Sequence, residues 1–304
     1  MGETGLIRPL DAANPADLEA ALALSASANW NQVEADWRTM LALGCGWGID
    51  SVAADGRKTL AASVLVLPYE AGAVAPFAWI SMVLVLPQFQ RQGLAQQVLR
   101  HAINFLEARG LTPMLDATHA GYAVYAQQGF ADTWGFARYR RQRRERSVAM
   151  SVHDRSALRL TRALQDSDWP AIDALDTPAF GACRLPLLRT LAQRLPRAAR
   201  VVEEGGRLCG FVLGRDGREA SQIGPLTTED VSTAASLIDS ALRELAGPVQ
   251  VDLPDRHAHL LPWLQAHGFE FQRPFIRMVH GATGVPAAPG DGERMVLVAG
   301  PELG

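Results

Sequence analysis

This chain has few cysteines, lacks long apolar runs and has only a small excess of negative charge. Three cysteines among 304 residues, an odd number at wide spacing, argue against a disulfide framework and a zinc site. The longest apolar stretch, residues 79–86, is too short to span a bilayer, and the first residues lack the segments of a signal peptide. A net charge of −3 gives no overall attraction for nucleic acid or an anionic membrane. We therefore expect a cytoplasmic protein that binds no metal, nucleic acid or membrane.

The most informative segment is a nearly continuous apolar run, residues 79–87, followed at once by Gln90-Arg91-Gln92-Gly93-Leu94-Ala95. The apolar run predicts a central strand that is covered on both faces. The apolar spacing from Leu94 to Leu106 predicts an amphipathic helix packed on the sheet. The unpaired amides and the positive dipole end of a helix start bind anions, and the small residues Gly93 and Ala95 let a pyrophosphate approach the backbone. We predict an anion site where the strand turns into this helix.

An internal repeat is the second strong signal. Two Gly-Phe pairs, at 129–130 and 268–269, are followed at the same offsets by a phenylalanine and an arginine, namely Phe136, Arg138, Phe275 and Arg277. With 48% hydrophobic residues, the chain holds enough apolar material for two cores. We predict two diverged copies of one α/β domain, residues 1–148 and residues 149–304.

The second copy differs from the first at the predicted anion site. Val231 and Thr233 replace the small residues of the first turn, and their β-branched side chains obstruct close approach to the backbone. The acidic pair at 229–230 repels phosphate, and Thr227 with Asp230 is expected to form a capping box for the helix. We therefore expect one phosphate-binding turn, in the first copy, and a degenerate turn in the second.

These features resemble the GCN5-related N-acetyltransferase (GNAT) superfamily, and in particular its tandem, two-copy members. The superfamily's signature Q/R-x-x-G-x-G/A follows a strand that ends in V-x-P, and Val85-Leu86-Pro87 with Gln90 to Ala95 matches both parts. Tyr125 and Gly129-Phe130 lie downstream at the expected distance, and the resemblance covers nearly the whole chain. It implies an α/β (mixed α+β) fold of two GNAT-like domains, each a central, mixed, mostly antiparallel sheet flanked by helices.

The resemblance also implies acetyl-CoA as the acetyl donor. In the family, the end of the central strand binds the pantetheine arm and the following turn wraps the pyrophosphate. The residues that this assigns to acetyl-CoA are Val83, Leu84, Val85, Arg91, Gln92, Gly93, Leu94, Ala95 and Gln96. The alternative is that Gly93 only eases a turn. Against it, no strong capping side chain stands at Gln90 to Gln92, so the helix amides are left for a ligand.

Tyr125 occupies the place where many family members have a tyrosine that protonates the departing CoA thiolate, and a buried core tyrosine is the alternative. The attacking amine must also lose a proton to a base. The candidates, each of which also has a purely structural interpretation, are Glu34, Asp36, Asp116 and His119.

Two tryptophans and two amides, Trp30, Asn31, Gln32 and Trp37, fall where the family fold closes over the acceptor. Aromatic walls with a few amides suit a small amine, although core packing of the tryptophans is also consistent with the sequence. The candidate substrate-binding residues are Trp30, Asn31, Glu34 and Asp116.

The sequence thus favours an acetyl-CoA-dependent N-acetyltransferase that moves an acetyl group to a primary amine of a small molecule, by direct attack in a ternary complex. The alternative is a non-catalytic acyl-CoA-binding regulatory or sensor protein, because no base is assigned and one copy has lost its phosphate turn.

The basic run 138–146 is interpreted as a solvated strand end and interdomain linker, with contact to the second copy or to the 3′-phosphate of CoA left open. The acceptor, and the choice between a monomer and a homodimer, are not decided.

Overall fold

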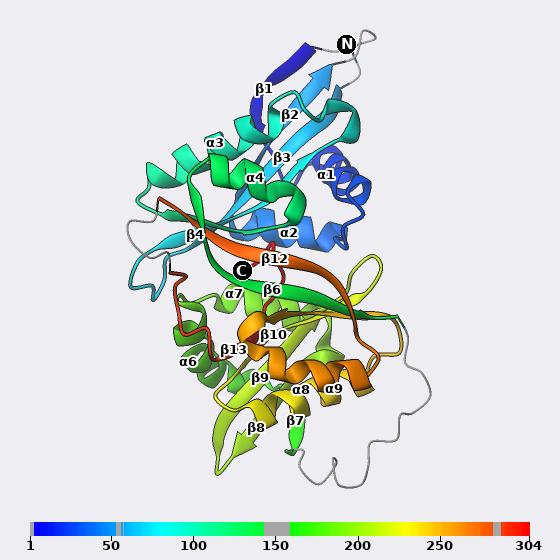
Figure 1. Cartoon of the computed structure of the whole chain (residues 1–304), viewed down its shortest axis with the longest axis vertical. Coiled ribbons are helices and arrows are strands. Elements are labelled where there is room, and N and C mark those ends of the chain that lie inside the picture. The colour runs from blue at the N-terminus through cyan, green and yellow to red at the C-terminus, as the bar shows by residue number, and fades with distance from the viewer. Residues whose placement is uncertain (1–2, 53–55, 57, 143–158, 282–286) are drawn as a thin grey trace.

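The structure, a computed structural model, describes residues 3–52, 56, 58–142, 159–281 and 287–304. Its centre is one 13-stranded mixed sheet in the order β1-β2-β3-β4-β5-β12-β6-β11-β10-β9-β8-β7, with β13 paired to β10. The sheet runs through both halves of the chain, and helices cover its two faces (Figure 1). Among the described residues, no helix is both long and apolar enough to cross a membrane.

The first half contains, in chain order, β1 (Glu3–Pro9), α1 (Pro15–Ser27), α2 (Glu34–Leu43), β2 (Cys45–Val52), β3 (Lys58–Tyr69), β4 (Phe77–Val85), η1 (Pro87–Phe89), α3 (Leu94–Glu107), β5 (Thr112–Ala117), α4 (His119–Gln127) and β6 (Phe130–Arg141). The predicted central strand is β4, which lies between β3 and β5. The predicted amphipathic helix is α3, and every residue of its apolar stripe is buried. Both of these predictions are confirmed.

The second half repeats this order of elements. It contains β7 (Thr161–Ala163), η2 (Asp166–Asp168), α6 (Trp169–Phe180), α7 (Leu185–Arg194), η3 (Pro196–Ala198), β8 (Arg200–Glu204), β9 (Arg207–Arg215), β10 (Ser221–Thr228), α8 (Val231–Arg243), β11 (Val249–Pro254), η4 (Asp255–Leu260), α9 (Leu261–Ala266), β12 (Glu270–His280) and β13 (Met295–Leu297). The proposed domain boundary at 148/149, and the end of the basic run at 143–146, lie outside the described residues.

The two halves exchange their long strands β6 and β12. Strand β12 of the second half pairs antiparallel with β5 of the first, while β6 of the first half pairs antiparallel with β11 of the second. The two exchanged strands also pair with each other, and Figure 1 shows them side by side across the middle of the molecule. Each copy of the sheet is thus completed by a strand of the other, which the sequence repeat did not predict.

Two buried ion pairs bridge the exchanged strands to the partner half. Arg138 on β6 donates from Nε and Nη2 to the two carboxylate oxygens of Asp252 on β11, at 2.8 and 2.7 Å. Arg277 on β12 makes the equivalent pair with Asp116 on β5, at 2.9 and 3.0 Å. The repeated arginines of the sequence are therefore the reciprocal contacts that join the two copies.

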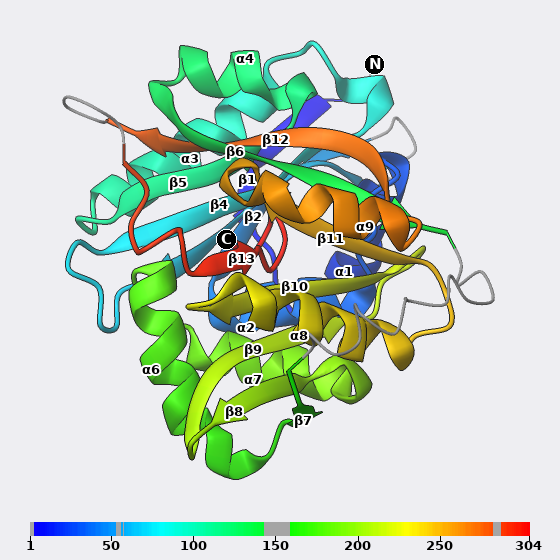
Figure 2. The ribbon, with the colours of Figure 1, turned by 60° about the horizontal axis from the view of Figure 1, so that its bottom comes forward.

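Apolar packing joins the halves as well. The rings of Phe136 and Phe275 stack with their centroids 4.9 Å apart, and one hydrophobic cluster contains residues of both halves, from Trp37 on α2 to Phe211 on β9. Separate clusters lie under α3 and α4 and under α8 and α9. The last described residues end at the middle of the molecule, between the two halves (Figure 2).

Removing one partner of a bridging pair should destabilise the whole fold. We expect Asp252→Ala to lower the free energy of unfolding by about 3–5 kcal/mol, because it leaves Arg138 buried without a counter-charge. Glu34→Ala is the matched control, since the Glu34–Arg38 pair is exposed and should contribute less than about 0.5 kcal/mol. Urea denaturation of the three proteins measures both effects, and equal losses for the two variants would contradict the assignment.

Candidate active site

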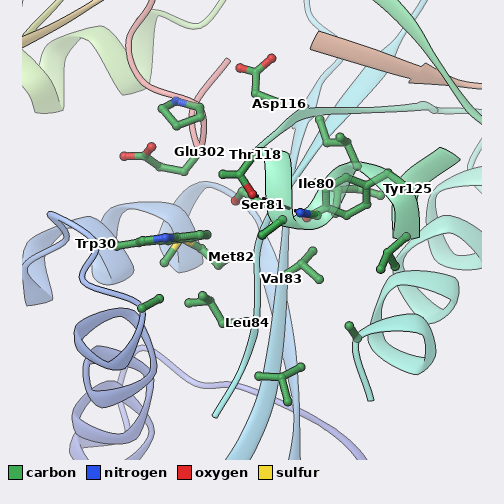
Figure 3. Close-up of a pocket in the computed structure, with 18 of the residues that line it drawn as sticks. Trp30, Ile80, Ser81, Met82, Val83, Leu84, Asp116, Thr118, Tyr125 and Glu302 are labelled. Carbon is green, nitrogen blue, oxygen red and sulfur yellow. Dashed lines mark hydrogen bonds between the residues drawn. The ribbon is translucent and has the colours of Figure 1, made fainter. Parts of the chain in front are cut away.

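The candidate site lies where the parallel strands β4 and β5 separate. They pair at three positions only, from Phe77 opposite Thr112 to Trp79 opposite Met114. Beyond that point a cavity of about 880 Å³ opens between them. Its walls come from the end of β4, the starts of α3 and α4, the connection between α1 and α2, strands β6 and β12, and residues 301–302 (Figure 3).

A bulge in β4 shapes one wall of this cavity. The register between β3 and β4 shifts here, Met82 has a φ of +51°, and the Ser63 hydroxyl donates to the Met82 carbonyl at 2.8 Å. A bulge bends a strand and re-aims its side chains. After the bulge, Val83, Leu84 and Val85 line the cavity on the side where β4 no longer pairs with β5.

The start of α3 forms the end of the same wall. Gly93 is the residue before the helix, with a φ of +80°, and no side chain of the described residues caps the helix start. A Cβ built on Gly93 would have no heavy atom within 4 Å. Gly93, Leu94, Ala95 and Gln96 line the cavity together with Arg91. Uncapped first-turn amides beside open space are what an anion such as a phosphate requires.

Tyr125 lines the cavity from α4, facing the β4 wall (Figure 3). A Cβ at Gly121 would lie 2.7 Å from the Tyr125 ring, so a glycine one turn earlier lets the ring lie against the start of the helix. Burial raises the pKa of Tyr125 to about 12. The hydroxyl therefore keeps its proton at neutral pH and can act as a proton donor.

Two carboxylates line the cavity. The Asp116 side chain is fully buried in its pair with Arg277. Burial raises the pKa of Asp116 to about 6, although Arg277 favours its charged form. The second carboxylate, Glu302, pairs with Arg215 and accepts a hydrogen bond from Gln32 Nε2 at 3.0 Å. The sequence assigned no role to Glu302.

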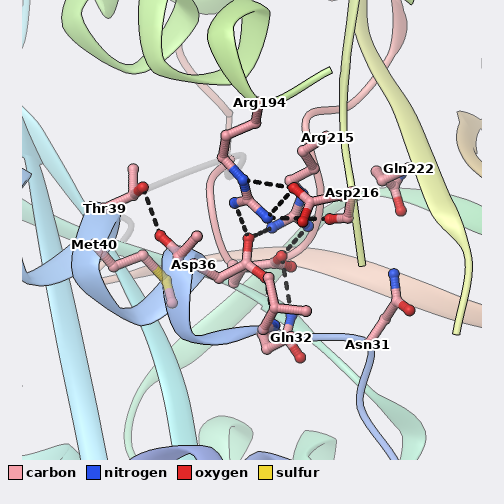
Figure 4. Close-up of polar contacts among 12 residues, drawn as sticks. Asn31, Gln32, Asp36, Thr39, Met40, Arg194, Arg215, Asp216 and Gln222 are labelled. Carbon is pink, nitrogen blue, oxygen red and sulfur yellow. Dashed lines mark hydrogen bonds and ion pairs between the residues drawn. The ribbon is translucent and has the colours of Figure 1, made fainter. Parts of the chain in front are cut away.

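The other two acidic candidates do not line the cavity. Asp36 is buried between Arg194 and Arg215 of the second half, at 2.5 and 2.6 Å (Figure 4). Burial favours the neutral acid, but these two guanidinium groups hold the pKa of Asp36 below its ordinary value. Glu34 is exposed and pairs with Arg38. Asp36 therefore joins the two halves, and Glu34 lies on a solvated helix face.

Of the four residues predicted to close over the acceptor, which we call the acceptor wall, three line the cavity and one does not. Trp30, Asn31 and Gln32 line the cavity, whereas Trp37 is fully buried and its indole N–H donates to the Ser25 hydroxyl at 3.3 Å. Asn31 is held by the second half, because its Nδ2 donates to the Ala220 carbonyl at 2.8 Å. Asn31 thus positions the wall rather than offering a free amide.

The remaining predicted residues are placed as follows. His119 lines the cavity from the start of α4, whereas Gln92 is exposed and does not line it. Sequence reasoning missed several other lining residues, which are Ile80, Ser81, Phe89, Thr118, Arg273, Pro274, Phe275, Pro301 and Glu302. Those from β12 were not predicted to line a site, although Phe275 belongs to the sequence repeat, because the strand exchange alone brings them here. Glu302 lies in the segment 300–304, which resembles the tandem family.

In the second half the corresponding opening is filled by the chain itself. Strands β10 and β11 pair from Ser221 to Ile223, and β13 then lies between them. It pairs with β10, and Val298 N donates to the Asp252 carbonyl on β11 at 3.0 Å. Asp230 is the N-cap of α8 and accepts from Ser232 N at 3.1 Å. The start of this helix therefore satisfies one of its own amides. The predicted capping box is wrong, because Thr227 lies in β10 and its hydroxyl donates to Asp176 Oδ1 at 3.0 Å.

Each half contains a parallel strand pair followed by a helix start, β4 and β5 with α3 in the first half and β10 and β11 with α8 in the second. Only the first half has a glycine at the helix start and an open cavity there. Residues 24–130 match the acetyltransferase (GNAT) family, and residues 172–291 match the acetyltransferase (GNAT) domain. The chain belongs to the GNAT superfamily, and it is a tandem member.

Individual relatives are distant in sequence. The Bacillus subtilis (strain 168) protein named uncharacterized N-acetyltransferase YitH is 23% identical over 190 residues, which are 62% of this chain and 65% of that protein. The match thus spans less than two thirds of that relative.

Solved structures share the fold over most of the chain. A Pyrococcus horikoshii protein proposed to be an acetyltransferase has a TM-score of 0.74 at 19% identity, covering 98% of this chain and 95% of that one. A GCN5-related N-acetyltransferase from Sphaerobacter thermophilus has a TM-score of 0.63 at 15% identity, covering 93% and 98%. A tandem GNAT protein from the clavulanic acid biosynthesis pathway has a TM-score of 0.62 at 15% identity, covering 93% of this chain and 100% of that one.

The Asp116 carboxyl should titrate near pH 6. Its pKa in the folded protein, about 6, lies above the ordinary 3.8, so its contribution to stability is greatest below a pH of about 4 and is lost as the pH rises through 6. Carbon-13 NMR of protein labelled at the aspartate carboxyls measures the midpoint, with the signal assigned by its loss in Asp116→Asn. A midpoint of about 4 or lower would show that Arg277 outweighs burial.

Proposed function

We propose that the protein is an acetyl-CoA-dependent N-acetyltransferase that transfers the acetyl group to a primary amine of a small molecule in a ternary complex. The observation that carries this proposal is one continuous cavity. It joins the uncapped start of α3, which suits a phosphate, to a wall containing Trp30, which suits an organic acceptor. Donor and acceptor would meet between these two ends, so no covalent enzyme intermediate is needed.

The donor end fits acetyl-CoA. The amides of Leu94, Ala95 and Gln96 would hold the pyrophosphate with Arg91 nearby, and the unpaired side of β4 at residues 83–85 would hydrogen-bond the pantetheine arm. Acetyl-CoA supplies the thioester whose carbonyl carbon the amine attacks. Because β13 occupies the corresponding opening of the second half, we propose a single donor site, in the first of the two domains.

Tyr125 would act as the general acid. The C–S bond breaks as the new C–N bond forms, and the Tyr125 hydroxyl gives its proton to the departing thiolate. Of the four candidate bases, Asp116 and His119 line the cavity, and the amine proton would leave toward that side. A carboxyl with a pKa of about 6 is mostly ionised at neutral pH and suits this role.

The alternative is an acyl-CoA-binding sensor without catalysis. A panel of primary amines separates the two, with CoA release followed by a thiol reagent and acetyl-CoA binding followed by calorimetry. Release that depends on an amine supports the transferase. Binding of acetyl-CoA with no release on any amine would favour the sensor.

Gly93→Glu should weaken acetyl-CoA binding by about 100-fold or more. The new carboxylate would stand at the proposed pyrophosphate site, replacing attraction by repulsion and costing charge-assisted hydrogen bonds. Gly110→Glu is the matched control, since Gly110 follows the other end of α3, has a φ of +70° and also has open space for a Cβ. Calorimetric titration with acetyl-CoA gives both affinities, and unchanged binding by Gly93→Glu would refute the donor site.

Tyr125→Phe should lower kcat by about 100-fold or more while acetyl-CoA affinity is little changed, because only the proton donor is removed. Tyr122→Phe is the control, since the Tyr122 hydroxyl lies on the same helix and bonds to Asp132 at 3.1 Å. Steady-state rates of CoA release measure the effect. Equal rates for the two variants would assign the proton transfer to another group.

A further inference from the structure

Arg273 is a cation at the cavity that pairs with no anionic side chain among the residues that the structure describes. It stands on β12, opposite Arg138 of β6, and it lines the cavity. Its guanidinium lies 5.3 Å from the centre of the Phe275 ring. No hydrogen bond or ion pair of this side chain is found within the part of the chain that the structure describes, and its Nε is buried without a partner.

The other charged groups at this end of the cavity are neutralised in pairs. Arg138 is bound through two hydrogen bonds to Asp252, Asp116 is bound to Arg277, and Glu302 is bound to Arg215. Each of these carboxylates thus already pairs with a guanidinium, although Glu302 shares Arg215 with Asp36. Arg273 is left over, and burial together with the neighbouring Arg138 lowers its pKa. A half-buried cation of this kind is stabilised when an anion binds beside it.

The position of Arg273 separates it from the proposed phosphate site. Side chains alternate along a strand, so Arg273, Phe275 and Arg277 share one face of β12. Phe275 belongs to the cluster that packs against α1 and α2, whereas Ile276 and Met278 pack against the cluster under α3 and α4. The proposed phosphate site is at the start of α3. Arg273 therefore lies on the face of the acceptor wall, with Glu302 and Trp30.

We propose that Arg273 recognises an anionic group of the acceptor, so that the substrate is a small primary amine that also carries a carboxylate. This inference rests on the proposed function and narrows its acceptor class to amino acids in the broad sense. A guanidinium binds a carboxylate through two parallel hydrogen bonds. Such a contact fixes the acid end of the acceptor at β12 and leaves its amine directed toward the thioester.

The size of the cavity limits the acceptor. The space of about 880 Å³ must also hold the acetyl and pantetheine end of the donor, so a compact amino acid fits and a folded protein surface does not. Beside the polar residues at this end, three lining residues, Trp30, Phe275 and Pro301, are apolar. They favour a compact acceptor with an apolar side chain or an apolar spacer between its amine and its carboxylate.

The experiment compares α- and ω-amino acids with their carboxamides, which keep the amine and remove the charge. Two readouts are measured for each compound, namely kcat/KM for CoA release and equilibrium binding to the CoA-saturated protein. We expect the acid of at least one pair to be preferred about tenfold or more. Arg273→Gln should reduce this preference by about 10- to 100-fold, and Arg273→Lys should restore part of it.

Arg38→Gln is the matched control, because it removes one cation from the exposed pair with Glu34 and should leave the preference unchanged. Unchanged acetyl-CoA affinity shows that the Arg273 variants are folded. Carboxamides that react and bind as well as the acids would overturn the inference while the transferase stands. Acids that bind in an Arg273-dependent way without any turnover would support the inference and refute the transferase. If neither series binds, the inference is overturned.

Discussion

The exchange of β6 and β12 is the constraint on which the rest of the molecule depends. Asp116 is buried on β5 of the first half and Asp252 on β11 of the second. A buried carboxylate requires a counter-charge. In both cases the guanidinium comes from the strand that crosses over from the other copy. Neither half can therefore bury its own aspartate alone. Two bidentate pairs, a shared apolar cluster and a continuous sheet make one folding unit out of two similar domains.

The same scaffold is used in two different ways. In the first half, β4 and β5 separate and leave a cavity. In the second half, β13 fills the corresponding opening between β10 and β11. The segment that fills it continues to Pro301 and Glu302, which line the cavity of the first half. The second domain thus contributes to the candidate site through β12 and through this last segment. We infer that it contributes to the acceptor wall and is not a second donor site.

Much of the proposed donor end is predictable because it depends on residues close together in the chain. The apolar strand, the glycine turn and the helix stripe depend on residues close in the chain, and the structure places Val83, Gly93 and Tyr125 on one cavity. The acceptor end is less predictable. Glu34 and Trp37 lie in the same segment as Trp30 and were predicted with it, yet Glu34 faces solvent and Trp37 lies in the core. Helix rotation and packing against the second half decide which side chains of that segment reach the cavity.

The sequence by itself determined the repeat, the strand and the helix on either side of the turn, the resemblance to the family and the turn that suits a phosphate, since each of these follows from the spacing of residue types along the chain. Only the tertiary structure decided which strands pair, which of the two parallel strand pairs keeps an open cavity and which charged side chains reach that cavity. The reason is that main-chain pairing in a sheet is available to any strand, whereas the side-chain pairs that select it join residues far apart. Asp252 is 114 positions from Arg138, and Arg277 is 161 positions from Asp116. Arg273 became a candidate for substrate recognition through that long-range pairing alone.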